Sequence, residues 1–285
     1  MIKAVVGTNG APSFEASVGG IAIYLDTFAI SSLAKGNIAL RQRFVTALHN
    51  GADLLFSIGH GIEIGGAQGA SSVAIKAFLD ELGAHWYPIQ FLVFDVVRSE
   101  SEGKHPGQCC FGEELLRKFF EAQTSEYGPT CGRVIDLSEQ FFRLGAFADW
   151  TTGSNSVLAL SRKLDKELID WIALLRAKAK QSPDWLDGEM PQLQFDPLRP
   201  ATFAFTNLMR DMVLNRGYQL KDGDGIDFSH AVMASAFSNF ATLDKQWKRR
   251  VDNFPLPNRG TRFYYKPELG AMVDDIESAL AHIKT

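Results

Sequence analysis

The order of apolar runs in the first 83 residues constrains the fold more than any other feature of the chain. Residues 21–25 and 53–58 are short and apolar, as in strands that are buried on both faces of a sheet. A helical pattern follows each run, over 31–48, where Gly36 is expected to interrupt it, and over 72–83. This alternation predicts an α/β fold with an open, mostly parallel sheet flanked by helices.

The rest of the chain leaves this alternation and later returns to it. Residues 1–18 are turn-rich with room for one short strand, and residues 86–100 have a strand-like middle. Residues 85–220 are otherwise mainly helical, with a Pro-rich acidic loop over 181–200. The last third predicts a helix starting near Asp227, a strand over 240–242, a helix from Lys245, an edge strand over 261–267 and a closing helix over 268–284. We therefore expect one α/β domain, 1–285, with a mainly helical insertion over 85–220.

Composition argues against several classes of protein. The formal net charge is −4, so nucleic-acid binding would depend on a local basic patch. No apolar run approaches the ~20 residues of a membrane span, and the N-terminus has no recognisable secretory leader. The three cysteines, two of them adjacent, suit neither a disulfide framework nor a zinc site. We expect a cytoplasmic protein with no membrane partner.

Acidic residues stand where the expected strands and helices meet. Asp26 ends the first strand, Glu63 follows the second, Asp227 opens a helix and Asp244 follows the strand over 240–242. In an open parallel sheet, ligands bind beyond the carboxyl ends of the strands, where these side chains would gather. Clustered carboxylates repel one another unless a cation compensates them, and Mg²⁺ prefers oxygen ligands. The pattern predicts a divalent-metal site suited to phosphodiester hydrolysis.

Two segments resemble PIN-domain nucleases. Residues 21–36, IAIYLDTFAISSLAKG, resemble the opening strand and first acid of that family. Residues 227–247, DFSHAVMASAFSNFATLDKQW, resemble its closing motif, in which an acid begins a helix and a short strand runs into Thr-x-Asp, here ending at Asp244. Glu63 stands where the family places its second acid. The resemblance covers residues 20–83 and 222–252.

The resemblance implies a Rossmann-like, three-layer PIN fold and a ribonuclease that depends on Mg²⁺ or Mn²⁺. Its metal ligands and catalytic acids would be Asp26, Glu63, Asp227 and Asp244, and its substrate RNA, with DNA as the less favoured alternative. The family usually follows its first acid with Thr-Asn or Ser-Asn, whereas Phe28 follows Thr27 here. Because small PIN toxins pair with antitoxins, an inhibitor protein or a second copy of the chain is a further partner to consider.

The acids also have a simpler interpretation as helix caps. Asp26 would cap through the amides of Ala29 and Ile30, and Asp244 would cap the helix that follows it. Asp227 also fits an N-cap, and either Asp222 or Asp224 would serve in its place as a ligand.

The sequence also predicts the environment of one acid and two histidines near these positions. Glu63 and His60 fall in the glycine-rich segment HGIEIGGAQG, which resembles an exposed, solvated loop. His230 follows Asp227 by three residues, on nearly the same helix face, and we expect it to be packed or hydrogen-bonded rather than a base.

A basic run follows Asp244 directly. Lys245, Trp247, Lys248 and Arg249 combine positive charge with an aromatic ring, which suits contact with phosphates and stacking on bases. The alternative is a solvated helix face.

Three functions are compatible with this sequence. The first is a metal-dependent endonuclease, and the second is a PIN-like module that binds nucleic acid or protein without cutting. The third is a phosphatase-like hydrolase with an aspartyl nucleophile. Phe28 counts against the third, because such enzymes usually place a second Asp two residues after the first.

Overall fold

The computed structural model describes residues 2–6, 12–65, 69–109, 111–125, 143–152, 155–182 and 184–283. Over these residues the chain is an α/β protein that divides into two units. Unit 1 comprises Met1–Gln90, Phe111–Ser154 and Lys266–Thr285, and unit 2 comprises Phe91–Cys110 and Asn155–Tyr265. The chain therefore enters and leaves each unit more than once.

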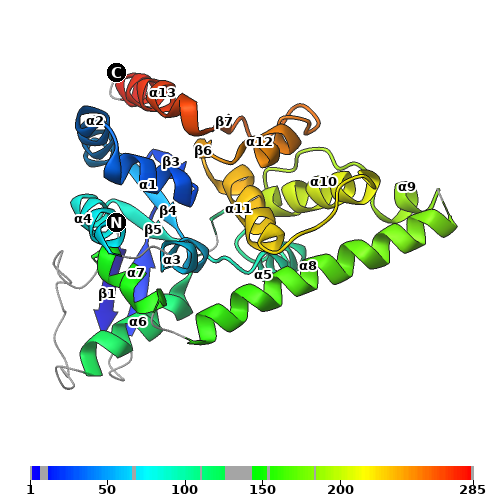
Figure 1. Ribbon diagram of the computed structural model, residues 1–285, viewed down its shortest axis with the longest axis horizontal. Helices are drawn as coiled ribbons and strands as arrows, with labels where there is room; N and C mark the ends of the chain where they lie inside the picture. Colours follow the sequence, from blue (N-terminus) through cyan, green and yellow to red (C-terminus); the bar gives the residue numbers. More distant parts are fainter. Residues whose placement is uncertain are drawn as a thin grey trace. The chain divides into compact units, whose positions relative to one another are not determined.

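Unit 1 contains a hairpin, three parallel strands and the helices that follow them (Figure 1). Its strands are β1 (Ile2–Val6), β2 (Pro12–Ala16), β3 (Ile21–Tyr24), β4 (Ala52–Phe56) and β5 (Trp86–Pro88). Its helices are α1 (Thr27–Lys35), α2 (Ile38–His49), α3 (Ile58–Gly65), α4 (Ala70–Glu81), α6 (Glu113–Ser125), α7 (Leu144–Thr152), the 3₁₀ turn η1 (Lys266–Glu268) and α13 (Leu269–Ile283).

The parallel strands of unit 1 lie in the order β5, β4, β3. Ile21 of β3 pairs with Ala52 of β4, and every residue of both strands is buried. The two apolar runs predicted as buried strands are thus confirmed. Gly36 separates α1 from α2 as predicted, and the side chain of Asn37 starts the second helix by accepting a hydrogen bond from the Ala39 amide at 2.8 Å.

Two expectations for this region are wrong. The first 18 residues contain an antiparallel pair, β1 and β2, rather than one short strand. The strand-like run after Trp86 is a strand only over β5, and its second half is a helix, α5 (Val93–Ser101). Val93, Val96 and Glu100 are the buried residues of α5, so burial follows the helical period although the run is rich in valine.

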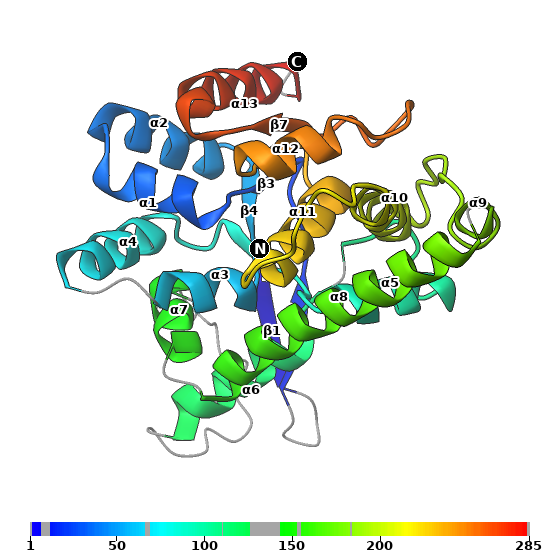
Figure 2. The same cartoon turned by 45° about the vertical axis from the view of Figure 1, so that its right-hand side comes forward.

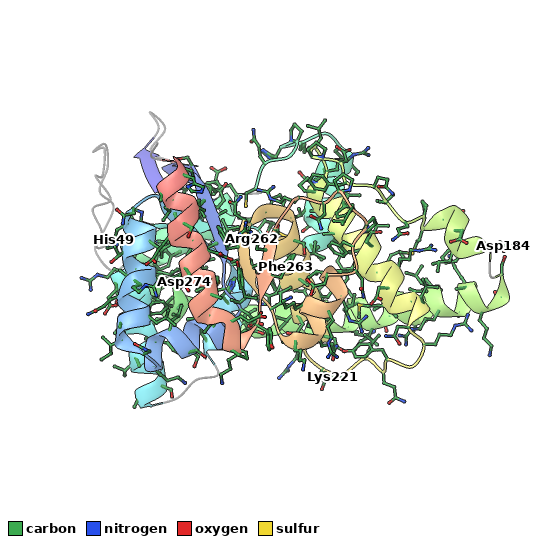
Figure 3. The ribbon with its side chains drawn as sticks, turned by 90° about the horizontal axis from the view of Figure 1, so that it is seen from above. His49, Asp184, Lys221, Arg262, Phe263 and Asp274 are labelled. Atoms are coloured by element: carbon green, nitrogen blue, oxygen red, sulfur yellow. The ribbon has the colours of Figure 1, made fainter. Side chains whose placement is uncertain are left out.

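The last helix of the chain packs beside α2 in unit 1. Arg43 of α2 donates to the carboxylates of Asp274 and Glu277 on α13, and these bonds lie at the protein surface. Figure 3, which views the molecule from above, labels Asp274 on α13 and His49 at the end of α2. The predicted closing helix is therefore confirmed.

Unit 2 is mainly helical and carries one pair of parallel strands. Its helices are α5, α8 (Asn155–Gln181), α9 (Trp185–Glu189), α10 (Pro200–Leu214), α11 (Asp224–Phe237) and α12 (Lys245–Val251). The strands are β6 (Phe240–Thr242) and β7 (Arg262–Tyr264), both as predicted. The long helix α8 contacts α10 and α11, and Figure 2 shows these helices from a second direction.

Glu100 joins two helices of unit 2. Its buried carboxylate accepts hydrogen bonds from the backbone amides of Ala201 and Thr202, at 2.9 and 2.7 Å, and so caps the first turn of α10. A carboxylate from α5 thus supplies the cap that Arg199, the residue preceding α10, does not make with its own side chain.

The segment predicted as a helical elaboration, 85–220, is mainly helical where the structure describes it. It does not form a separate body, because β5, α6 and α7 belong to unit 1 while α5, α8, α9 and α10 belong to unit 2. Within the described part of the chain, none of the helices is long and apolar enough to cross a membrane.

Candidate functional site

Asp26 stands at the exit of β3, between a buried strand and the first turn of α1. Leu25 before it is fully buried, and Asp26 itself is half-buried. The amides of Ala29 and Ile30 bond to the main-chain oxygen of Asp26, at 2.9 and 3.1 Å, and its carboxylate makes no capping bond to the helix. The interpretation of this side chain as a helix cap is therefore wrong. The Thr27 hydroxyl donates to Oδ1 at 3.3 Å, at the long end of hydrogen bonding.

His60 connects the ends of β3 and β4. Its ring is fully buried, so the expectation of an exposed loop histidine is wrong. The Ser57 amide donates to Nδ1 at 3.0 Å, and Nε2 lies 2.8 Å from the carbonyl oxygen of Leu25. Because Nδ1 accepts, the proton belongs on Nε2, which donates to that carbonyl. The histidine thus fixes the main chain directly before Asp26.

Glu63 lies on a helix and not in a solvated loop. Residues 60–65 of the glycine-rich segment belong to α3, residues 66–68 lie outside the described residues, and Glu63 is half-buried in the second turn of the helix. Parallel neighbours β3 and β4 end at the same edge of the sheet, so α1 and α3 begin at that edge and contact each other. In unit 1, Asp26 therefore lies at the start of α1 and Glu63 lies on α3, and these two helices follow neighbouring strands at the same edge of the sheet.

A glycine explains why so unusual a helix forms here. A Cβ atom at Gly61 would meet the Thr151 hydroxyl oxygen of α7 at 2.0 Å, far inside any real contact. Glycine is thus required for α3 and α7 to pack closely, and this tertiary contact overrides the low helix propensity of the segment.

The acids predicted in the closing motif belong to unit 2. The helix that contains Asp227 begins three residues earlier than predicted, at Asp224, so Asp227 is a half-buried residue of the first turn. Asp224 is fully buried and accepts hydrogen bonds from the Tyr218 hydroxyl at 2.6 Å and the Lys221 amide at 2.8 Å. These bonds give Asp224 a structural role in the loop before the helix.

His230 is packed, as predicted, rather than exposed. It is 2% exposed on α11, and its ring centroid lies 4.9 Å from that of Phe91.

Asp244 caps α12, which confirms the interpretation of this residue as a helix cap. Its carboxylate is exposed, and Oδ1 accepts a hydrogen bond from the Trp247 amide at 2.8 Å. A cap uses one oxygen of the carboxylate, so this bond does not exclude a metal on the other oxygen. The prediction that Asp244 is a metal ligand stays a prediction.

Two substitutions separate the cap from the ligand. Asparagine caps helices about as well as aspartate, so we expect Asp244→Asn to keep the free energy of unfolding in EDTA. Asp244→Ala should lower it by about 1 kcal/mol, because the Trp247 amide loses its acceptor. If Asp244 binds metal, Mn²⁺ should stabilise both variants less than the wild type. Urea titrations in EDTA and in Mn²⁺ measure this, and full Mn²⁺ stabilisation of Asp244→Asn would leave Asp244 a cap alone.

The basic run on α12 divides into exposed and engaged side chains. Lys245 and Arg249 are exposed, whereas Lys248 pairs with Asp252 at 2.9 Å. Trp247 is 2% exposed and packs against Phe228, with ring centroids 6.2 Å apart. The interpretation of Trp247 as a surface for base stacking is wrong, because its ring faces the core of unit 2. Lys245 and Arg249 remain available for phosphates.

The sequence alone did not predict the structural roles of two residues, His60 next to Asp26 and Arg250 on α12. The bond from His60 to Leu25 depends on a loop that becomes a helix, and no spacing within the segment HGIEIG signals it. Arg250, which directly follows the basic run, is a second missed residue: it is 7% exposed and pairs with Asp211. Its position three residues after Trp247, on the same helix face, is the one signal for its burial.

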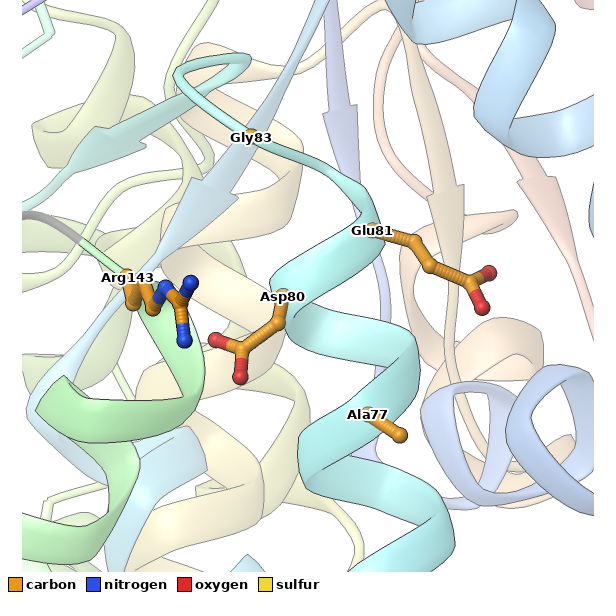
Figure 4. A pocket seen from close by; sticks show the side chains of 5 residues that line it. All are labelled: Ala77, Asp80, Glu81, Gly83 and Arg143. Carbon is orange, nitrogen blue, oxygen red and sulfur yellow. The ribbon is translucent and has the colours of Figure 1, made fainter. Parts of the chain in front are cut away.

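The acidic residues of a polar pocket elsewhere in unit 1 are engaged in bonds within the protein. It has a volume of about 270 Å³ and is lined by Ala77, Asp80, Glu81, Gly83 and Arg143. Figure 4 shows Asp80 and Arg143 turned toward each other and Glu81 turned away. Asp80 accepts from the Gly145 amide at 3.1 Å, and Glu81 pairs with Arg41 at 2.5 Å. These acids therefore hold helices together.

No three His, Cys, Asp or Glu side chains among the described residues are grouped so as to hold a metal ion. No family model matches the sequence, and comparisons with curated proteins and with solved structures find no match.

Proposed function

We propose that the protein is a metal-dependent nuclease of PIN-like architecture that cleaves RNA internally. The observation that carries the proposal is Asp26, a half-buried carboxylate at the exit of a buried parallel strand, which does not cap the helix it precedes. Glu63 supports it, because α3 leaves the neighbouring strand at the same edge of the sheet. This edge is where open parallel sheets bind their ligands.

The chemistry of these side chains fits Mg²⁺ or Mn²⁺. Protein sites for Mg²⁺ commonly use only one or two carboxylates, with water and substrate phosphates completing the shell. Asp26 and Glu63 are therefore sufficient donors, and the lack of a three-residue group within the described residues does not conflict with such a site. The prediction that Asp227 and Asp244 add further ligands stays a prediction. When bound, the ion would acidify a water molecule and offset charge on the phosphate oxygens.

The residues of the chain have separable roles in this proposal. Asp26 and Glu63 supply oxygen atoms that orient water and hold the cation. His60 positions Asp26, because its Nε2 bond holds the Leu25 carbonyl in place. Lys245 and Arg249 attract the phosphate backbone, which gives a chain of net charge −4 a local affinity for a polyanion.

The proposal is tested by incubating the purified protein with a fluorescently labelled single-stranded RNA and following cleavage. We expect internal cleavage in Mg²⁺ or Mn²⁺ and none in EDTA. A protein that binds the RNA but leaves it intact in every metal would instead support the alternative of a non-catalytic binding module. Cleavage that proceeds equally in EDTA would overturn the metal-dependent mechanism.

A further inference from the structure

A cavity of unit 2 opens beside the basic face of α12. It has a volume of about 440 Å³ and is lined in part by Asn215, Tyr218, Lys245, Arg249, Arg250 and Asn253. We call it the α12 pocket. Its wall comes from the end of α10, from the segment after α10, from α12 and from the residues that follow α12, and all of these belong to unit 2.

The α12 pocket carries a surplus of positive charge. Lys245, Arg249 and Arg250 line it together with one acid, Asp211. Asp211 is paired with Arg250, whereas Lys245 and Arg249 pair with no carboxylate of the described residues. Two exposed cations are thus left at the cavity without an internal counterion.

The deeper wall of the pocket consists of side chains that are engaged with one another. The Arg250 guanidinium is 7% exposed and lies 4.5 Å from the ring centroid of Tyr218 and 5.5 Å from that of Trp247. The Tyr218 hydroxyl donates to Asp224, and burial together with this bond raises the pKa of Tyr218 to about 12. Tyr218 therefore stays neutral at physiological pH and adds no negative charge to the cavity.

A second arginine holds the loop that forms this wall. Arg176 of α8 donates to the carbonyl oxygens of Met212, Asn215 and Tyr218, at 2.8, 2.9 and 2.9 Å. Burial and the positive charge of Arg250 both lower the pKa of Arg176. Arg176 therefore fixes the backbone that positions Asn215 and Tyr218 at the wall of the pocket.

We propose that the α12 pocket binds a backbone phosphate of single-stranded RNA, an inference that rests on the proposed function. Lys245 and Arg249 would neutralise the phosphate, while the amides of Asn215 and Asn253 can donate to its oxygens. A hollow of this volume admits one flexible nucleotide, and pockets of this size commonly hold small ligands. A duplex would present its phosphates along a stiff outer surface, which suits a concave pocket poorly.

The test is the salt dependence of RNA binding in EDTA, which removes the metal that the proposed cleavage requires. Fluorescence anisotropy of a 12-nucleotide oligouridylate is measured for the wild type and for Lys245→Gln/Arg249→Gln. Each phosphate neutralised on a single strand adds about 0.7 to the slope of log affinity against log salt, so we expect the double variant, which no longer neutralises the one bound phosphate, to lose ~0.7 of the slope. Lys163→Gln/Lys166→Gln is the matched control. It removes the same amount of positive charge from α8, outside the α12 pocket, where each lysine pairs with an acid four residues later.

Each outcome decides between the pocket and the enzyme. An unchanged slope in the Lys245/Arg249 variant overturns the pocket, and the proposed function then stands or falls on cleavage in Mn²⁺. A reduced slope with no cleavage in any metal supports phosphate binding and overturns the nuclease. Competition by uridine monophosphate as strong as that by the oligomer would overturn a strand-binding role in favour of free nucleotides. If the α8 control loses as much slope as the Lys245/Arg249 variant, the loss is explained by the change in net charge alone, and the pocket proposal is overturned.

Discussion

Asp26→Asn is expected to abolish most of the metal-dependent cleavage of RNA while the protein stays folded. Asparagine keeps the size of the side chain but removes its charge, and a neutral amide is a poor ligand for a hard divalent cation. Loss of several kcal/mol of transition-state stabilisation corresponds to a rate lower by roughly 10³-fold. The capping role that would have confounded this substitution is absent, since the Ala29 and Ile30 amides bond to the main-chain oxygen.

The rate should be measured under single-turnover conditions, at saturating Mn²⁺, with circular dichroism to check the fold. Asp274→Asn is a matched control in the same unit, because Asp274 is an exposed residue of α13 that pairs with Arg43. The control should cleave like the wild type. Equal rates for wild type and Asp26→Asn would remove Asp26 from the mechanism.

His60→Phe has the largest expected effect on stability. Phenylalanine fills most of the buried volume but leaves the Ser57 amide and the Leu25 carbonyl without the bonds that His60 makes to them. Leaving a buried polar group unsatisfied costs about 1–3 kcal/mol, so we expect the free energy of unfolding to fall by about 3 kcal/mol. Urea denaturation measures this, and exchange of the Ser57 amide proton should accelerate as well.

The matched control for His60→Phe is His49→Phe, because His49 is exposed at the end of α2. It should change the free energy of unfolding by no more than about 0.5 kcal/mol. If His60→Phe is as stable as this control, the hydrogen bonds at the end of β3 do not hold the chain before Asp26. In that case the positioning role assigned to His60 is lost.

Local patterns were sufficient to predict the elements whose signals agree with one another. The runs over 21–25 and 53–58 are apolar and short, and they became β3 and β4 because no competing period exists in them. Gly36 marked the break between α1 and α2, because glycine interrupts a helical pattern, whereas the cap that Asn37 makes on α2 was not predicted.

Other elements depend on tertiary contacts that no local pattern contains. Glycine content argued against a helix at α3, but Gly61 is the residue that allows α7 to approach it. Valine content argued for a strand at α5, although the spacing of Val93, Val96 and Glu100 already followed a helical face. In both cases packing decided the structure and intrinsic propensity did not.

The candidate site shows the same division. That Asp26 ends a buried strand was predictable from the apolar run before it. That its carboxylate does not cap α1, while Asp244 does cap α12, was not, because both sequences place an Asp at an N-cap position. The burial of Trp247 likewise follows from the face that α12 turns toward Phe228, and a charge run gives no measure of that orientation.

Anomalous diffraction from crystals soaked in Mn²⁺ tests the central claim most directly. The account predicts a peak within roughly 2–2.5 Å of a carboxylate oxygen of Asp26, as expected for an oxygen-bound divalent ion. The same soak of Asp26→Asn crystals should lose the peak. Crystals of the wild type that show no Mn²⁺ at Asp26, with the ion absent or bound only elsewhere, would contradict the assignment of this strand exit as the metal site.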